Sequence, residues 1–250
     1  MLESRTVKPF LIVKVGSALD ELVRERGDFE AWFIDALGIR PTTVRVADVR
    51  RGDALPSPRE VGAVLITGSA AMVTARAPWS VRTAAWLPDV LSAGVPLLGV
   101  CYGHQLVADA LGGEVGRNPR GREIGTVEVK RTPEAAEDPL LASVPERFTV
   151  QNTHVEAVLR LPPGAVRLAR SPGDVNHAFR AAPRAWCVQF HPEMDAAVIR
   201  RYIAARAKAL RAENLDPDAL IAAAHDSPHG RALLRRFASL AGYSPSDHAA

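Results

Sequence analysis

The sequence PLLGVCYGHQ, residues 96–105, is the stretch that decides the fold. An apolar run ends at Cys101, and the residues from Gln105 to Leu111 follow the apolar spacing of a helix. Gly99 and Gly103 flank the cysteine and allow the backbone to turn tightly. The stretch therefore predicts a buried strand, a sharp turn and a helix, with the cysteine at the turn and its thiol at the edge of a sheet.

Before this stretch, short apolar runs rich in β-branched residues alternate with helix-like segments. Each helix-like segment is followed by glycine, which is common at helix ends. The alternation is typical of βαβ units, which build a parallel sheet covered on both faces. The expected strands are Phe10–Val15, Thr43–Ala47, Ala63–Thr67 and Val95–Val100, and the expected helices are Phe29–Leu37 and Ser80–Ala93.

After Gly121 strand-like segments follow one another with only turns between them, which predicts a mixed region with hairpins. From Asp195 to about Leu240 apolar residues recur at helical spacing, with a break near Asp216-Pro217. We expect a three-layer α/β domain whose mainly parallel central sheet becomes mixed in its second half, followed by a helical C-terminal appendage. The later strands are expected at Gly125–Lys130, Phe148–Gln151, Val166–Ala169, His177–Arg180 and Ala185–Phe190.

The composition narrows the class of protein. The chain has 250 residues, and its 31 Lys and Arg are interspersed with 28 Asp and Glu, so no basic block favours a nucleic-acid partner. No apolar run reaches the roughly 18–20 residues of a membrane helix. Two cysteines are too few for a secreted disulfide scaffold. We expect one soluble domain in the cytoplasm, with neither nucleic acid nor a membrane as partner.

Cysteine chemistry is the hypothesis that the central stretch suggests. The N–H groups at the start of a helix lower the pKa of a neighbouring thiol and can stabilise an oxyanion. A second motif, QFHPE at residues 189–193, offers a base, because His191 ends an apolar strand and Glu193 lies two residues beyond. On extended chain this spacing points both side chains the same way. Cys101, His191 and Glu193 could then act as nucleophile, base and orienter, although a buried cysteine and a structural histidine would give the same local patterns.

Taken together, GVCYGHQ at residues 99–105 and QFHPE at residues 189–193 resemble the paired signature of class I glutamine amidotransferases. The resemblance extends from about Phe10 to about Glu193. It implies the flavodoxin-like fold of that family, in which residues 1–194 form the amidotransferase domain. Residues 195–250 would form a helical C-terminal extension packed on the same domain.

The resemblance also implies roles for individual residues. Cys101 would be the nucleophile, His191 the general base and later the acid, and Glu193 the group that orients the imidazole. Two backbone amides would bind the oxyanion, one from Tyr102 and one from the turn at Gly68 and Ser69. Relatives commonly have Gly-Gly-Pro in that turn, where this chain has Gly-Ser-Ala. The substrate-binding residues implied by position are Gln105, Thr153, His154, Val155 and Glu156.

Two of these assignments have structural alternatives. His154 could equally serve as a structural residue at a strand edge. The segment Gly121–Gly125 resembles a short motif of the stand-alone branch of the family, and it also suits a plain turn into a strand.

Three functions are compatible with the sequence. The first is hydrolysis of the glutamine side-chain amide through a cysteinyl thioester, with ammonia passed to a separate ATP-dependent synthetase. The second is hydrolysis of γ-glutamyl peptides by the chain alone, because amide and isopeptide carbonyls require the same oxyanion chemistry. The third is a binding or regulatory module that has kept the fold without turnover.

We expect no cofactor. A metal site made of Cys101, Cys187, His177 and His191 lacks the close cysteine or histidine pair that usually seeds one. The fragment Thr67-Gly68-Ser69 is too short for a phosphate-binding loop.

Overall fold

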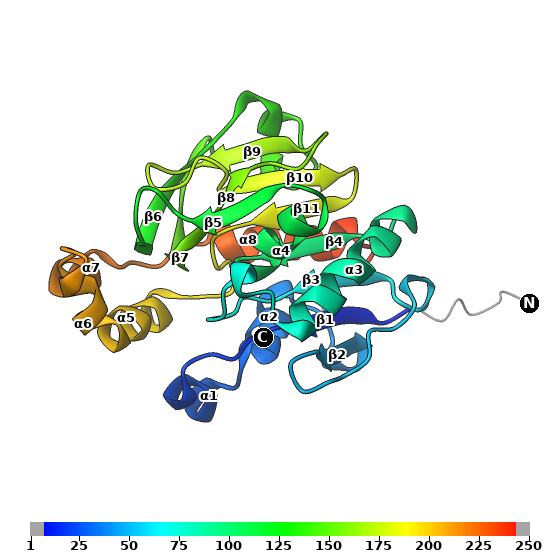
Figure 1. The fold of residues 1–250 in the computed structure, drawn as a ribbon, viewed down its shortest axis with the longest axis horizontal. Helices are drawn as coiled ribbons and strands as arrows, with labels where there is room; N and C mark the ends of the chain where they lie inside the picture. Colours follow the sequence, from blue (N-terminus) through cyan, green and yellow to red (C-terminus); the bar gives the residue numbers. More distant parts are fainter. Residues whose placement is uncertain (1–7, 244–250) are drawn as a thin grey trace, which may run out of the picture.

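The computed structural model describes residues 8–243. In this part of the chain a nine-stranded sheet has the order β2-β1-β3-β4-β11-β10-β9-β6-β7, with helices on both faces (Figure 1). The strands from β2 to β11 are parallel, and those from β10 to β7 pair antiparallel. The prediction of an α/β fold with a parallel first half and a mixed second half is therefore confirmed.

The strands of the large sheet are β1 (Phe10–Lys14), β2 (Val44–Asp48), β3 (Ala63–Ile66), β4 (Leu97–Val100), β6 (Glu123–Arg131), β7 (Arg147–His154), β9 (Val166–Arg170), β10 (Ala178–Ala182) and β11 (Ala185–Val188). A second, two-stranded sheet pairs β5 (Glu114–Arg117) with β8 (Glu156–Arg160). The helices are α1 (Asp20–Arg26), α2 (Phe29–Leu37), α3 (Pro78–Ser92), α4 (Tyr102–Ala110), α5 (Ala196–Ala205), α6 (Ala207–Ala212), α7 (Pro217–Ala223) and α8 (His229–Leu240).

Side-chain alternation along the strands produces two cores, one on each face of the sheet. In β1, Phe10 and Ile12 pack on the face that carries α2, α5 and α8, whereas Leu11 and Val13 pack on the face that carries α3 and α4. All four side chains are fully buried. Burial on both faces explains why this strand is continuously apolar rather than alternating.

Cys101 lies at a strained turn between β4 and α4. Its φ is 51° and its ψ is −99°, which places a residue with a side chain in the region that favours glycine. The backbone here is closely packed: a Cβ on Gly99 would lie 2.6 Å from the carbonyl oxygen of Gly103, and a Cβ on Gly103 would lie 2.6 Å from that of Ile66. These two glycines let α4 start directly against the ends of β3 and β4.

The C-terminal helices form two groups: α5, α6 and α7 lie together, and α8 packs elsewhere on the sheet. α5 contacts β6, β7 and α7, and the helices α5–α7 extend from one side of the molecule (Figure 1). α8 returns to pack against α2 and β7, where Phe237 lies against Phe10 with 6.1 Å between ring centroids. The division of the chain at residues 194 and 195 stays a prediction, and residues 244–250 of the expected extension lie outside the described residues.

Three elements differ from the sequence-based expectation. No helix was expected over α1, because its sequence DELVRER is mostly charged and contains a single buried residue, Leu22. The small sheet of β5 and β8 was also missed, because both strands are short and partly exposed.

Within residues 8–243, no helix combines the length and the apolarity needed to cross a membrane.

We predict that Gly103→Ala destabilises the protein, because the new methyl group would meet backbone atoms of β3 that cannot rotate away. The expected loss in free energy of unfolding is about 1–3 kcal/mol, measured by urea denaturation. Gly116→Ala is the matched control, since its methyl group would meet only the tip of the half-exposed Leu159 side chain. Equal midpoints for the two variants would contradict the packing argument.

Candidate active site

The parallel pairing of β4 with β11 joins the two motifs in space. Val100 lies beside Val188 in register, and the N–H of Cys101 donates to the carbonyl of Val188 at 2.9 Å. Beyond β11, the N–H of His191 donates to the carbonyl of Gln151 in β7, also at 2.9 Å. The two strand ends thus place Cys101 and His191 next to each other despite their separation in sequence.

Cys101, His191 and Glu193 lie together at this point. The imidazole of His191 is close enough to Cys101 for the sulfur to act on its pKa, and its Nδ1 lies 2.7 Å from Oε1 of Glu193. Glu193 lies in a turn after His191, not on the extended chain that the sequence analysis assumed. Pro192 reverses the chain there, and the turn brings the carboxylate back to the ring.

The electrostatics of the group favour a charged imidazole. Burial lowers the pKa of His191, but the negative charges of Glu193 and Cys101 and their hydrogen bonds outweigh it and raise the pKa from 6.5 to about 10. An imidazolium beside a thiolate is the charge state in which the sulfur is nucleophilic and the ring can protonate a leaving group. Cys187, by contrast, is fully buried in β11, and burial raises the pKa of its thiol well above the ordinary range.

Backbone amides that could hold an oxyanion lie around the sulfur. Tyr102 is the first residue of α4, so its N–H has no acceptor within the helix. Gly68 follows β3, and a Cβ there would lie 2.7 Å from Cε1 of His191 and 3.6 Å from Cβ of Cys101. Only glycine therefore fits at this position. Ser69 and Cys101 both line one cavity, which is described below, so the predicted oxyanion turn lies next to the predicted nucleophile.

A cavity of about 410 Å³ opens over Cys101. Its volume lies within the roughly 300–1,000 Å³ of small-molecule sites. The catalytic candidates Cys101 and His191 form part of its wall, whereas Glu193 lies behind His191. The wall also includes residues 17–20, 69–72 and 153–156 together with Phe29, Tyr102, Gln105, Arg122, Tyr202 and Arg206.

The segment Thr153–Glu156 forms the wall opposite the helix N-terminus. The carbonyl oxygen of Thr153 lies 4.0 Å from Sγ of Cys101. His154 is held from both ends, because its Nδ1 lies 2.8 Å from the carbonyl oxygen of Glu156 and its Nε2 lies 3.1 Å from the carboxylate of Glu123. The imidazole therefore fixes the path of the segment, and a role of His154 in substrate binding stays a prediction.

Glu123 is the centre of a buried polar network behind this wall. Its carboxylate accepts from the hydroxyl of Ser171 at 2.6 Å and from the amide of Asn152, and it lies 3.2 Å from Nε2 of His177. Burial raises the pKa of Glu123, but hydrogen bonds from His154 and His177 outweigh it and the pKa is lowered. In the described part of the chain these three side chains have a spacing compatible with metal ligation, yet hydrogen bonds already connect them.

Gln105 and Glu156 use their side chains within the protein. The amide of Gln105 donates to the carbonyl of Glu156 at 2.8 Å and to the side-chain oxygen of Gln189 at 3.0 Å. The carboxylate of Glu156 accepts from the N–H of Val73 at 3.0 Å and from the hydroxyl of Thr74. Both residues line the cavity, but these bonds show them tying its walls together.

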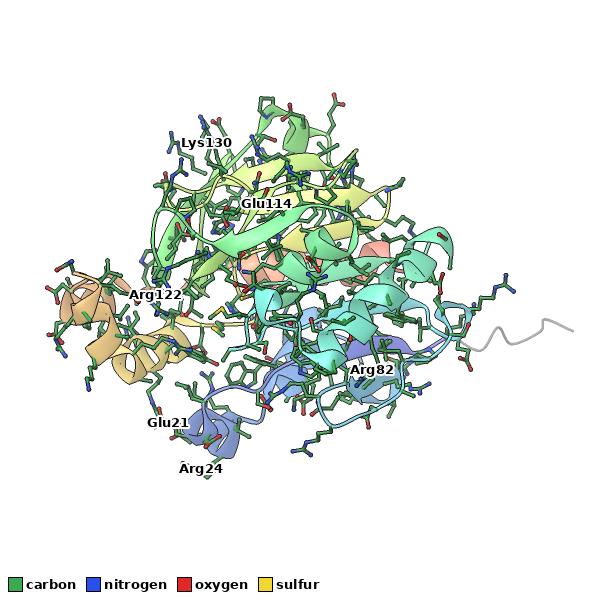
Figure 2. All side chains as sticks on the ribbon, in the orientation of Figure 1. Glu21, Arg24, Arg82, Glu114, Arg122 and Lys130 are labelled. Atoms are coloured by element: carbon green, nitrogen blue, oxygen red, sulfur yellow. The ribbon has the colours of Figure 1, made fainter. Side chains whose placement is uncertain are left out.

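Sequence reasoning missed the wall contributed by the C-terminal helices. Tyr202 in α5 and Arg206, directly after it, both line the cavity. The sequence around these two residues predicts only an amphipathic helix, and it contains no motif that indicates a functional site. Arg122, which is labelled in Figure 2, also lines the cavity. Its guanidinium forms two hydrogen bonds, of 2.8 and 3.0 Å, with the carboxylate of Glu213, the residue after α6.

The combination of fold and site agrees with comparison to known proteins. A family model described as "Glutamine amidotransferase class-I" matches residues 40–206. The chain belongs to the class I glutamine amidotransferase family. This enzyme family is the one that the two sequence motifs indicated, and the match includes both of them and also Arg206.

Curated relatives of this amidotransferase are much longer proteins. Over 185 residues it is 38% identical to a GMP synthase [glutamine-hydrolyzing] of Aeropyrum pernix, a match that covers 74% of this chain and 32% of the relative. Over 133 residues it is 39% identical to the corresponding enzyme of Thermomicrobium roseum, covering 53% of this chain and 23% of the relative. The chain thus spans about a third or less of these relatives.

Solved structures share the fold over almost the whole length. A glutamine amidotransferase from Thermotoga maritima superposes with a TM-score of 0.71 at 22% identity, covering 94% of this chain and 99% of that one. A glutamine amidotransferase from Methylobacillus flagellatus gives a TM-score of 0.70 at 23% identity, covering 98% and 99%. These likenesses establish the amidotransferase fold.

We predict that Glu193→Gln lowers the pKa of His191, because it removes the carboxylate charge that helps to stabilise the imidazolium. An NMR titration of the ring protons should show wild-type His191 losing its proton near pH 10 and the variant at a lower pH. Glu114→Gln removes an exposed carboxylate elsewhere and should leave the titration unchanged. A wild-type midpoint near 6.5 would contradict the charge assignment.

Proposed function

We propose that this chain hydrolyses the side-chain amide of glutamine through a thioester on Cys101. The observation that carries the proposal is the grouping of Cys101 with His191, whose Nδ1 lies 2.7 Å from Glu193, at the wall of a cavity, with the sulfur at the first turn of α4. Family membership supports the same reaction.

The proposed reaction has two stages, formation of the thioester and its hydrolysis. The Cys101 thiolate attacks the γ-carbonyl carbon, and the N–H of Tyr102 with an N–H of the Gly68–Ser69 turn stabilises the oxyanion. Collapse of this intermediate breaks the carbon–nitrogen bond, and the His191 imidazolium gives its proton to the departing ammonia. His191, now neutral, takes a proton from water as the water attacks the thioester. Glutamate leaves and the thiolate is restored.

We further propose that the ammonia is passed to a separate ATP-dependent synthetase. The support is the similarity to glutamine-hydrolysing GMP synthases, of which this chain spans about a third. The test is reconstitution with a GMP synthetase chain that lacks a glutaminase region. Synthesis of GMP that uses glutamine only when this chain is added would support the pairing, and synthesis that responds only to added ammonia would refute it.

Cys101→Ala should abolish glutamine hydrolysis, since no other group in the site can form the thioester. Ammonia release and labelling by a glutamine-like electrophile, followed by mass spectrometry of the intact protein, measure the two consequences. Cys187→Ala is the matched control, because that thiol is equally buried but lies outside the cavity. An adduct that persists in Cys101→Ala, or its absence in folded wild-type protein, would refute the assignment, and the second result would favour a non-catalytic module.

His191→Asn should lower kcat by about 10²- to 10⁴-fold, the usual effect of losing a general acid–base group. Glu193→Gln should have a smaller effect, because the imidazole keeps its contact with Cys101. Steady-state kinetics with glutamine check both values. A loss in Glu193→Gln as large as that in His191→Asn would show that the carboxylate does more than orient and charge the ring.

A further inference from the structure

Glu123, His154 and His177 form a buried cluster behind the wall that faces Cys101. Glu123 begins β6 and lies beside His154, the last residue of β7, in register, and His177 directly precedes β10. The side chains of the two histidines are 1% and 0% exposed, and that of Glu123 is 10% exposed. The ends of three strands thus bring two imidazoles and one carboxylate together inside the protein.

The spacing of these groups suits a single metal ion. Oε2 of Glu123 lies 3.1 Å from Nε2 of His154 and 3.2 Å from Nε2 of His177. The ligand atoms of the three residues all lie within 4.8 Å of one another. Hydrogen bonds have such lengths, but zinc bonds of about 2.0 Å in a tetrahedral arrangement also place neighbouring ligand atoms about 3.3 Å apart. The atoms that hydrogen bonds connect can therefore face one ion with little movement.

The surroundings of His154 are those of a ligating histidine. Its Nδ1 lies 2.8 Å from the carbonyl oxygen of Glu156, and because a carbonyl only accepts hydrogen bonds, Nδ1 has the proton. In the neutral ring Nε2 then presents a lone pair to the carboxylate of Glu123, 3.1 Å away. Two acceptors this close require a cation between them, either a proton or a metal ion. Metal-ligating histidines commonly donate their other N–H to a backbone carbonyl in this way.

The remaining contacts of the cluster also fit a metal site. Oε1 of Glu123 accepts from the hydroxyl of Ser171 at 2.6 Å, as ligating carboxylates are usually held, and Oε2 faces the histidines. The amide of Asn152 donates to Oε2, and its Nδ2 lies 3.0 Å from Nε2 of His177. Among residues 8–243, Oδ1 of Asn152 is buried without a hydrogen-bond partner. A half-turn of the amide would exchange Nδ2 for this oxygen and supply a fourth ligand.

The chemistry of the donor set points to one metal. Two imidazoles with one carboxylate suit Zn²⁺, whereas Mg²⁺ and Ca²⁺ prefer oxygen ligands alone. Four protein ligands close the site, as in structural zinc sites. We infer that Glu123, His154 and His177 bind one zinc ion, with Asn152 as the fourth ligand. The ion holds residues 153–156 in place opposite Cys101 and takes no part in the thioester reaction.

Zinc binding is measured with the full chain carrying Cys101→Ala, because a thiolate beside His191 would also bind zinc. The protein is produced with zinc in the medium, desalted, analysed for metal content and titrated with a chelator of known affinity. X-ray absorption at the zinc edge then gives the ligands. We expect one ion per chain, bound only to nitrogen and oxygen at about 2.0–2.2 Å.

Variants in the same Cys101→Ala background identify the ligands. His177→Gln and Glu123→Gln should each weaken zinc binding by more than about 100-fold, since loss of an outer-shell partner alone costs about 10- to 100-fold. Ser171→Ala removes only the hydrogen bond to Oε1 and should fall within that lower range. His225→Gln, which changes an exposed histidine, is the matched control and should leave the affinity unchanged. Circular dichroism checks that each variant folds.

Hydrogen exchange tests the effect of the ion on the wall. The N–H groups of residues 153–156 should exchange at least about tenfold more slowly with zinc at ten times its Kd than in chelator-treated protein, because an ion that binds only the folded segment stabilises it by that factor. Helix α1, which contains none of the ligands, is the internal reference. Equal exchange of the segment in both forms would refute the structural role of the ion.

Three results would overturn the zinc site itself. The first is folded protein that retains no zinc, which would assign a proton to the place between His154 and Glu123. The second is a zinc–sulfur distance of about 2.3 Å, which would move the ion to Cys187. The third is an unchanged affinity in folded His177→Gln. Since the nucleophile is absent from all of these proteins, the outcome does not depend on glutamine hydrolysis.

Discussion

The parallel contact between β4 and β11 is the constraint on which the site depends. Its register sets Val100 beside Val188, so that one strand delivers a sulfur and the other an imidazole to the same end of the sheet. The carboxyl ends of parallel strands are where α/β proteins commonly bind their ligands. Gly99 and Gly103 are required for the first of these strand ends, because any larger residue would push α4 away from the sheet. The positive φ of Cys101 is maintained by this close packing.

The remaining walls are fixed by polar contacts between distant parts of the chain. Glu123 and His154 anchor the segment that faces the sulfur, and Glu156 joins that segment to Val73 and Thr74. The ion pair of Arg122 with Glu213 attaches the C-terminal helices to β6. These contacts tie the walls of the cavity to elements that are distant in sequence.

The C-terminal helices contribute Tyr202 and Arg206 to the wall of the cavity. Tyr202 and Arg206 follow soon after the His-Pro-Glu motif, so the chain that supplies the base also supplies the adjoining wall.

The sequence was sufficient for the alternation of strands and helices, because each element depends on residues that are near one another in the chain. It also singled out Cys101, His191 and Glu193, whose catalytic roles stay predictions. The strands β5 and β8 and the helix α1 escaped prediction, since they are short and take their stability from tertiary contacts rather than from a local pattern. The turn that returns Glu193 to His191 was likewise not visible in the spacing of the two residues.

Only the tertiary structure could decide the environment of these groups. The raised pKa of His191 and the engagement of Glu156 and Gln105 within the walls arise between elements far apart in the sequence. Local sequence determined which chemical groups the protein has and the strand ends from which they project. Burial and Coulomb forces depend on distances in space, so the fold decides the electrostatic environment of each group.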